Sequence, residues 1–197
     1  MTRRTASFQR KTKETDIQGA LTLDGEGVYD IETGIGFLDH MLEQWAWHGM
    51  MDVSIKAQGD IHVDCHHMAE DVGLALGDAL ARSLGEKKGI MRYGSVLSPM
   101  DDALVMVVVD CSGRGWLGWD VRFADERIGG LATSSLREFC KAFADRSHIT
   151  LHVRLLCGVN DHHIAEAIFK GLGRALRHAV AIDGRQKDRI PSTKGQL

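Results

Sequence analysis

The sequence lacks the features of a secreted, membrane-spanning or linker-rich protein. Only two of its 197 residues are proline, which excludes a proline-rich linker. The longest uninterrupted apolar run, Ala103 to Val109, is far too short to cross a bilayer. The N-terminal MTRRTASFQR is positively charged but has no apolar stretch of the kind found in secretory signals. The four cysteines include no CxxC pair, so we expect no disulfide framework and a cytoplasmic location.

A basic charge excess is also missing. The formal net charge is −3, which argues against general nucleic-acid binding because such binding needs a basic surface. The rest of the composition is ordinary, with 44% hydrophobic and 26% charged residues, as in a globular domain. A chain of this length forms one large domain or two small domains that share a core. The composition therefore predicts a globular protein with neither a membrane nor a nucleic acid as partner.

One short motif occurs twice in the chain. VDCHHMAED contains two adjacent histidines followed by a glutamate, and NDHHIAEAIFK contains the same pattern. Each member recurs after the same interval of 96 residues, which is close to half of the chain. The members are His66, His67 and Glu70 in the first copy and His162, His163 and Glu166 in the second. This spacing indicates an internal duplication.

The hydrophobic pattern repeats as well. In the first half it predicts strands within 3–31, a helix at 35–50, a strand at 52–57 and a helix at 66–85. In the second half it predicts strands at 90–98, 103–110 and 115–123, a helix at 130–147, a strand at 149–156 and a helix at 162–181. Both halves therefore have the order β-β(-β)-α-β-α.

This order predicts an α/β (α+β) fold of two duplicated β-β-α-β-α halves, each a mixed sheet with helices packed on it. We expect the first structural repeat at 1–88 and the second at 89–197, together forming one compact unit. The second repeat includes the C-terminal tail RIPSTKGQL. The tail is predicted to be extended, because Pro191 is unfavourable inside a helix.

The spacing within each motif suits metal binding. On a helix, residues four apart share a face, whereas adjacent residues diverge by about 100°. Each motif therefore offers a His/Glu pair to one ion and its second histidine to another. The predicted site one contains His66, Glu70 and His163, and site two contains His162, Glu166 and His67. A single such motif could be a solvated helix start, but its recurrence favours metal binding. Imidazole and carboxylate ligands suit Mn, Fe, Co, Ni or Zn.

Seven stretches of the chain carry a resemblance to a known family. They are RKTKET (10–15), GIGFLDHML (34–42), HHMAEDVGLALG (66–77), GIMRYG (89–94), DCSGR (110–114), LHVRLLCGVNDHHIAEAIFKGLGRAL (151–176) and PSTKG (191–195). In this order they resemble imidazoleglycerol-phosphate dehydratase over essentially the whole length. The resemblance implies a fold like that of ribosomal protein S5 domain 2. It also implies a hydro-lyase of histidine biosynthesis, in its single-activity form.

The reaction implied by the resemblance converts D-erythro-1-(imidazol-4-yl)glycerol 3-phosphate to 3-(imidazol-4-yl)-2-oxopropyl phosphate and water. The resemblance further implies two Mn²⁺ ions per active site and one more ligand for each ion. These ligands fall on His152 at site one and on His40 at site two. The duplication does not relate them, because Lys56 and Leu136 stand at the corresponding positions. Cys65 stands where the family usually has aspartate, and we do not count it as a ligand.

The implied substrate carries a phosphate, which needs fixed cations and hydrogen-bond donors. The matching stretches offer candidate substrate contacts at Glu14, Gln44, Arg92, Arg114, Lys170, Ser192, Thr193 and Lys194. A carboxylate must also move a proton, and the candidates are Glu166, Glu70 and Glu14, with Glu166 and Glu14 favoured. The other histidines, at 48, 62, 148 and 178, are interpreted as surface or structural residues.

The resemblance implies a homo-oligomer, a hollow shell of twenty-four chains with metal sites between subunits. Two other functions fit the duplicated motif. A dinuclear metal hydrolase of a phosphorylated small molecule would use the same ligands and would release different products. A structural metal protein would have saturated coordination and would leave PSTKG and Arg114 without a purpose.

Overall fold

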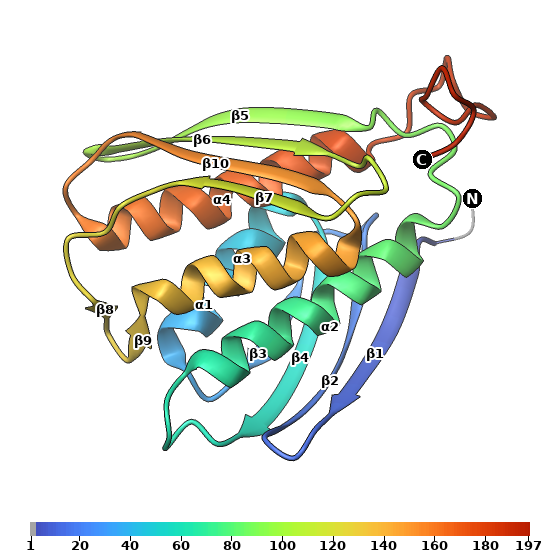
Figure 1. The fold of residues 1–197 in the computed structure, drawn as a ribbon. Helices are drawn as coiled ribbons and strands as arrows, with labels where there is room; N and C mark the ends of the chain where they lie inside the picture. Colours follow the sequence, from blue (N-terminus) through green and yellow to red (C-terminus); the bar gives the residue numbers. More distant parts are fainter. Residues whose placement is uncertain (1–2) are drawn as a thin grey trace.

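The structure, a computed structural model, describes residues 3–197 (Figure 1). The first half forms a four-stranded sheet in the order β1-β2-β4-β3. Its elements are β1 (Thr5–Lys11), β2 (Thr15–Thr22), β3 (Tyr29–Glu32), α1 (Gly36–Gly49), β4 (Asp52–Gly59) and α2 (His66–Leu84). Strands β3 and β4 are parallel, and the other pairs of this sheet are antiparallel.

The second half repeats this topology, with the sheet order β5-β6-β10-β7. Its elements are β5 (Tyr93–Met100), β6 (Ala103–Asp110), β7 (Trp116–Asp120), α3 (Thr133–Ser147), β10 (Thr150–Cys157) and α4 (Asp161–Val180). Again one pair, β7 and β10, is parallel and the others are antiparallel. The predicted fold of two duplicated halves, each a mixed sheet with its own helices, is confirmed.

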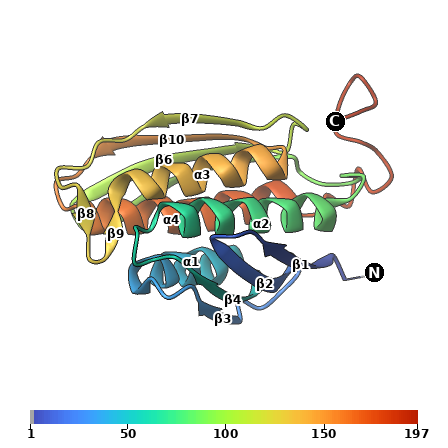
Figure 2. The same ribbon diagram turned by 60° about the horizontal axis from the view of Figure 1, so that its bottom comes forward.

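The helices form two layers between the two sheets (Figures 1 and 2). Helix α1 packs against α4, and α2 packs against α3, so the two halves bury one shared core. Trp45 of α1 meets Phe143 of α3 edge to face at 5.7 Å between ring centroids. Gly77 and Gly173 occupy equivalent places in the two motif helices. A Cβ on Gly77 would lie 2.8 Å from the Phe143 carbonyl oxygen, and one on Gly173 would overlap the Trp45 carbonyl, so glycine permits both close helix contacts.

Two predicted boundaries and the predicted conformation of the tail are corrected. The helix expected from residue 130 begins at Thr133, because 127–132 form the short hairpin of β8 (Arg127–Ile128) and β9 (Leu131–Ala132). The strand expected from residue 90 begins at Tyr93, because Arg92 has a left-handed backbone with φ 72°. The C-terminal tail is not helical, as Pro191 requires, but it runs through turns and is not extended. Among residues 3–197, no helix combines the length and apolarity needed to span a membrane.

Candidate metal centre and substrate site

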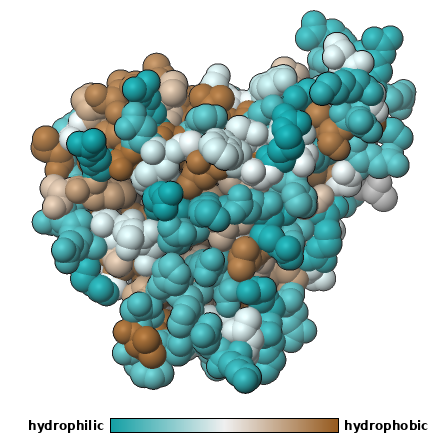
Figure 3. Space-filling model, in the orientation of Figure 1, coloured by the Kyte–Doolittle hydropathy of each residue, from teal (hydrophilic) through white to brown (hydrophobic). Residues whose placement is uncertain are grey.

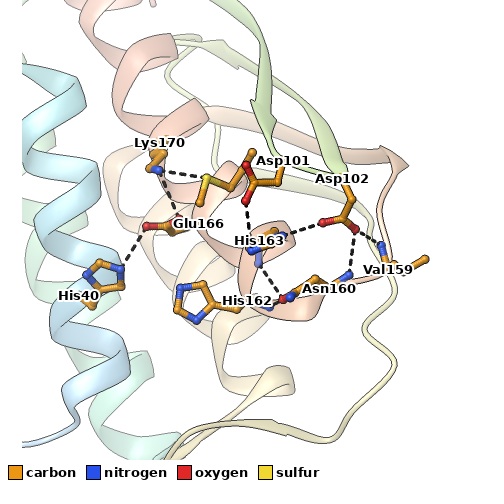
Figure 4. A network of polar contacts seen from close by, with 10 residues as sticks. His40, Asp101, Asp102, Val159, Asn160, His162, His163, Glu166 and Lys170 are labelled. Carbon is orange, nitrogen blue, oxygen red and sulfur yellow. Dashed lines mark hydrogen bonds and ion pairs between the residues drawn. The ribbon is translucent and has the colours of Figure 1, made fainter.

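The second histidine motif opens helix α4. Asn160 caps this helix, and its side-chain oxygen accepts hydrogen bonds from the backbone N–H groups of His162 and His163. Helix α1 lies alongside and brings His40 to the same place, where its Nε2 is 3.2 Å from Glu166 Oε1 (Figure 4). The donor atoms of His40, His162 and Glu166 all lie within 4.8 Å of one another.

This cluster fits a divalent transition-metal ion. Two imidazoles and one carboxylate are the donor types that Mn²⁺ and its neighbours accept, and three protein ligands leave coordination positions open. The Glu166 side chain is only 8% exposed, so its charge needs a positive partner. Lys170, one turn later on α4, supplies one, because its Nζ donates to Glu166 Oε2 at 3.3 Å. The carboxylate is therefore held in place from both sides.

The first motif opens helix α2 in a more open setting. Asp64 Oδ1 accepts a hydrogen bond from the His66 backbone N–H at 2.8 Å. His66 Nε2 and Glu70 Oε2 are 3.8 Å apart, and both side chains are almost half exposed. Cys65 points away from this pair, is buried, and donates its thiol hydrogen to the Gly130 carbonyl oxygen at 3.2 Å. The pair thus offers two potential ligand atoms, fewer than the three that gather at the second motif.

The second histidine of each motif has a carboxylate at Nδ1. Asp60 Oδ2 lies 3.0 Å from His67 Nδ1, and this contact raises the pKa of His67 above its ordinary value. Asp102 Oδ1 lies 2.7 Å from His163 Nδ1 (Figure 4). The backbone N–H of Val159 and then the His163 contact hold the pKa of Asp102 well below its usual range. Both rings therefore have Nε2 left for another partner.

On the Nε2 side, each of these rings faces a second, exposed carboxylate. Glu14 Oε1 is 3.8 Å from His67 Nε2, and Asp101 Oδ2 is 3.5 Å from His163 Nε2. Glu14, predicted to contact substrate or move a proton, thus lies beside the first motif. Its side chain is 52% exposed and free to turn toward a bound molecule.

The structure brings together only part of each predicted ligand set. For site two it gathers His40 with His162 and Glu166, without His67. For site one it pairs His66 with Glu70, without His163 and His152. Within residues 3–197, the His40 cluster is the one group of three or more such side chains that could hold an ion. His152 lies on β10 and is exposed, with its ring against Gly118 of the neighbouring β7.

A polar strip runs between α1 and α4, beginning at the His40 cluster. His40, Gln44 and His48 follow one another at four-residue steps on α1, so they share one face. Glu166, Lys170 and Arg174 follow at the same steps on α4. Burial, and then the charges of Lys170 and Arg174, lower the pKa of His48. His48 was interpreted from sequence as a surface or structural residue, but its eight-residue spacing from His40 was a signal that it lies on the same face.

The other predicted phosphate contacts gather at the C-terminal end of α4. Arg92 donates to Asp110 at 2.7 Å and to the Pro191 carbonyl oxygen at 2.8 Å, which fixes the tail. Leu197 packs against Gly113, beside Arg114. This corner projects at the upper right of Figure 1 and has a mainly hydrophilic surface (Figure 3). Ser192, Thr193 and Lys194 belong to it.

The predicted phosphate contacts of this corner lie far from the metal cluster within one chain. Helix α4 has 20 residues, and it separates its N-terminal histidines from the tail by roughly 30 Å at 1.5 Å per residue. Lys170 lies near the cluster, but Lys194 lies at the opposite end of the helix. Within one chain, a small substrate cannot contact both ends. The metal and tail candidates therefore do not form one pocket in a single chain.

Comparisons with known sequences and with solved structures point to the same family. The family model described as imidazoleglycerol-phosphate dehydratase matches residues 33–176. Imidazoleglycerol-phosphate dehydratases of Cereibacter sphaeroides and Methylorubrum extorquens are each 55% identical, over 98% of this chain and 100% of their own length. The crystal structure of the Staphylococcus aureus enzyme superimposes with a TM-score of 0.82 at 35% identity, covering 90% of this chain and 100% of that one. The Pyrococcus furiosus structure, in complex with (S)-C348, gives 0.82 at 40% identity, covering 96% and 99%.

Proposed function

The chain belongs to the imidazoleglycerol-phosphate dehydratase family, and we propose that its two histidine motifs hold two Mn²⁺ ions in each active site. The enzyme is a hydro-lyase that removes water from imidazoleglycerol phosphate in histidine biosynthesis. Loss of the hydroxyl on the carbon attached to the ring, and of a proton from the next carbon, gives an enol that becomes the 2-oxo product. The hydroxyl leaves with its electron pair and ends as water. The reaction therefore needs an imidazole ring that has lost its N–H proton and can supply electrons, and a base that takes the proton from the chain.

The cluster of His40, His162 and Glu166 is the observation that carries the metal proposal. When bound, the ions would act as Lewis acids toward the imidazole ring. In site two, His67 completes the set around this cluster. In site one, the ligands are His66, Glu70, His152 and His163. Each His/Glu pair comes from one helix face, and its third ligand comes from the other motif.

Glu14 is the carboxylate that is best placed for the proton transfer. Both carboxylate oxygens of Glu166 are engaged, one with His40 at 3.2 Å and the other with Lys170 at 3.3 Å. Glu14 is exposed and lies beside the Nε2 side of His67, where the substrate ring would be held. We assign removal of the carbon-bound proton to Glu14, with Glu166 as a ligand and Glu70 as the equivalent ligand of site one. Gln44, His48 and Lys170 line the strip along which the hydroxyls and phosphate would extend.

Two observations support an active site that is shared between copies of the chain. The predicted ligand sets are divided between two places, and Lys194 lies about a helix length from the His40 cluster. Arg92, Arg114, Ser192, Thr193 and Lys194 then serve the site of a neighbouring subunit. Leu97 in β5, Leu156 in β10 and Val159 in the loop before α4 are large apolar residues that are exposed in one chain. We propose a homo-oligomer, a shell of twenty-four chains, in which ions link subunits.

Free thiols accord with a cytoplasmic enzyme, which we also propose. All four cysteines are unpaired, and three of them are buried. Burial raises the pKa of the Cys111 and Cys140 thiols to about 12, so both stay protonated and unreactive. These thiols need no oxidising compartment.

The experiment that tests this proposal removes the metal and follows assembly and product together. Because ions held by two chains stabilise the contact between them, chelation should abolish turnover and reduce the particle size measured by light scattering. Added Mn²⁺ should restore both. Full turnover of a verified metal-free sample would contradict the metal proposal, and an intact shell without metal would contradict the shared site. Release of inorganic phosphate in place of the 2-oxo phosphate would favour the hydrolase.

A further inference from the structure

Each histidine motif has one aspartate that hydrogen-bonds its second histidine. His67 meets Asp60 from the loop that follows β4, and His163 meets Asp102 from the turn between β5 and β6. In both pairs the contact atom of the ring is Nδ1. An ionised carboxylate only accepts hydrogen bonds, so Nδ1 must carry the proton in each pair. Nε2 is then unprotonated in the neutral ring, which is the form that binds a metal.

We propose that Asp60 and Asp102 are positioning residues that fix the tautomer and orientation of His67 and His163, so that each ring presents Nε2 to an ion. The inference rests on the proposed function, since it concerns how these two histidines serve as ligands. A carboxylate behind a ligating histidine aligns the ring and raises its basicity. Because the arrangement occurs at both motifs, each ion would have one histidine whose ring already has the right orientation and tautomer before the ion binds.

The duplication does not account for this pairing. Asp60 follows β4, whose counterpart in the second half is β10, whereas Asp102 lies between β5 and β6, whose counterparts are β1 and β2. The two aspartates therefore come from unrelated places in the two halves, one before its helix and one from a distant turn. The same atom-to-atom contact nevertheless occurs at both motifs. A contact built twice from different parts of the chain points to a requirement of the site and not to a remnant of the duplication.

The two aspartates differ in how firmly they are held. Asp102 Oδ2 accepts backbone hydrogen bonds from Val159 at 2.6 Å and Asn160 at 3.0 Å, so its second oxygen must face those donors. Asp60 Oδ1 is buried and meets no hydrogen-bond partner from residues 3–197. Asp102 is thus fixed in one orientation. Asp60 is not, so an asparagine in its place can adopt either orientation of its amide group.

This difference gives a sharp test with Asp→Asn variants. In Asp102→Asn, the amide oxygen must stay on the Val159 and Asn160 donors, which turns the NH₂ group toward His163. The ring must then accept at Nδ1 and carry its proton on Nε2, where it blocks the metal. We expect Mn²⁺ affinity at that site to fall about 10–100-fold, as measured by equilibrium binding with Mn²⁺ paramagnetic resonance.

In Asp60→Asn, no fixed donors decide which way the amide points. Its oxygen can still accept from His67 Nδ1, so the loss of Mn²⁺ affinity should be smaller than in Asp102→Asn. Asp60→Ala removes the acceptor and should lower affinity more than Asp60→Asn does. Nitrogen-15 spectra of labelled histidine in the metal-free protein provide a readout independent of the metal. His163 should carry its proton on Nδ1 in the parent and on Nε2 in Asp102→Asn.

Two controls separate positioning from general damage. Asp120→Asn changes an exposed aspartate bonded to Arg154 in the same half, and it should leave Mn²⁺ binding unchanged. In a His163→Ala background, Asp102→Asn should cause no further loss of affinity, because it acts through that ring. If Asp102→Asn fails to fold, the Asp60→Ala and His67→Ala pair gives the same cycle at the other motif.

The outcomes distinguish this inference from the proposed function. If the parent binds Mn²⁺ and Asp102→Asn binds it equally well with an unchanged His163 tautomer, the positioning role is overturned and the metal site stands. An additive loss in the His163→Ala background also overturns it. If the parent itself binds no Mn²⁺, the proposed function fails, while the nitrogen-15 spectra still report whether Asp102 sets the tautomer.

Discussion

The two histidine motifs have the same residues at the same helix positions but different neighbours. At the start of α4, Glu166 is 8% exposed and contacts both His40 and Lys170. At the start of α2, Glu70 is 45% exposed, and within residues 3–197 its one ion-pair partner is His66. The duplication thus reproduced the helix and its motif. The helix packed alongside each motif determines which further contacts its glutamate makes.

The cause of this asymmetry lies in α1 and α3, which occupy equivalent places in the two halves. Helix α1 places His40 against the α4 motif. At the corresponding position, α3 has Leu136, which is fully buried in the core and offers no ligand. One motif therefore has a third potential ligand beside it in its own chain, whereas within residues 3–197 the other motif has none. An ion-sharing assembly is one way to make two unequal motifs into two complete sites.

Substituting the motif glutamates should have the largest effect, and the effect on stability should differ between the two motifs. Under the proposed mechanism, Glu166→Gln and Glu70→Gln each remove a charged metal ligand worth several kcal/mol, so activity should fall about 10³-fold in both. Only Glu166→Gln should also lower the free energy of unfolding of the metal-free chain, by about 1–3 kcal/mol, because it leaves Lys170 without its buried partner. Turnover assays and denaturant titration measure the two effects. A fully active Glu70→Gln variant would remove the first motif from the site.

Removing the second histidines should affect two different ions, because adjacent residues on a helix point in different directions. His67→Ala should weaken the ion of site two and His163→Ala the ion of site one, each by at least the roughly 10–100-fold caused by losing an outer partner. Metal analysis after gel filtration counts the ions that remain per chain. Loss of the same ion in both variants, with the other ion at full occupancy, would show that the ligands are grouped differently.

The variant Lys194→Ala tests the role of the tail independently of the histidine motifs. One charge-assisted contact contributes about 1.5–3 kcal/mol, so KM for the phosphorylated substrate should rise about tenfold or more. The two ions should stay bound, because Lys194 lies at the far end of α4 from the His40 cluster. Steady-state kinetics combined with metal analysis measures both. An unchanged KM would exclude the tail from the substrate site.

The features predicted correctly from sequence are those that follow from helix and strand periodicity. The duplicated topology and the placing of each His/Glu pair on one helix face are of this kind. His40 required the family resemblance, because its duplicated position is Leu136. Asp60 and Asp102 were not predicted, since a contact made from a loop has no periodicity. Lys170 and Lys194 lie near opposite ends of α4. This separation depends on the path of the tail after the helix, which residue spacing in the sequence does not predict.

The smallest expected effects concern the residue before each histidine pair, where Cys65 and Asp161 are equivalent. Both turn away from the histidines toward the segment 124–130. Asp161 accepts backbone hydrogen bonds from Ala124 at 3.0 Å and Asp125 at 2.7 Å, and Cys65 donates to Gly130 at 3.2 Å. Asp161→Ala leaves two donors without an acceptor and should lower the free energy of unfolding by about 1–3 kcal/mol.

Cys65→Ser keeps a donor at the same place, because a serine hydroxyl can also bond the Gly130 carbonyl. The free energy of unfolding should change by about 1 kcal/mol or less, and Mn²⁺ affinity should stay the same, since the thiol faces away from His66 and His67. Thermal denaturation and Mn²⁺ titration of the variant beside Asp161→Ala measure both quantities. A large loss of Mn²⁺ affinity in Cys65→Ser would make the thiol a ligand of the first motif. The more exposed first motif would then bind its ion with a soft sulfur ligand, which the second motif lacks because Asp161 stands at the equivalent position.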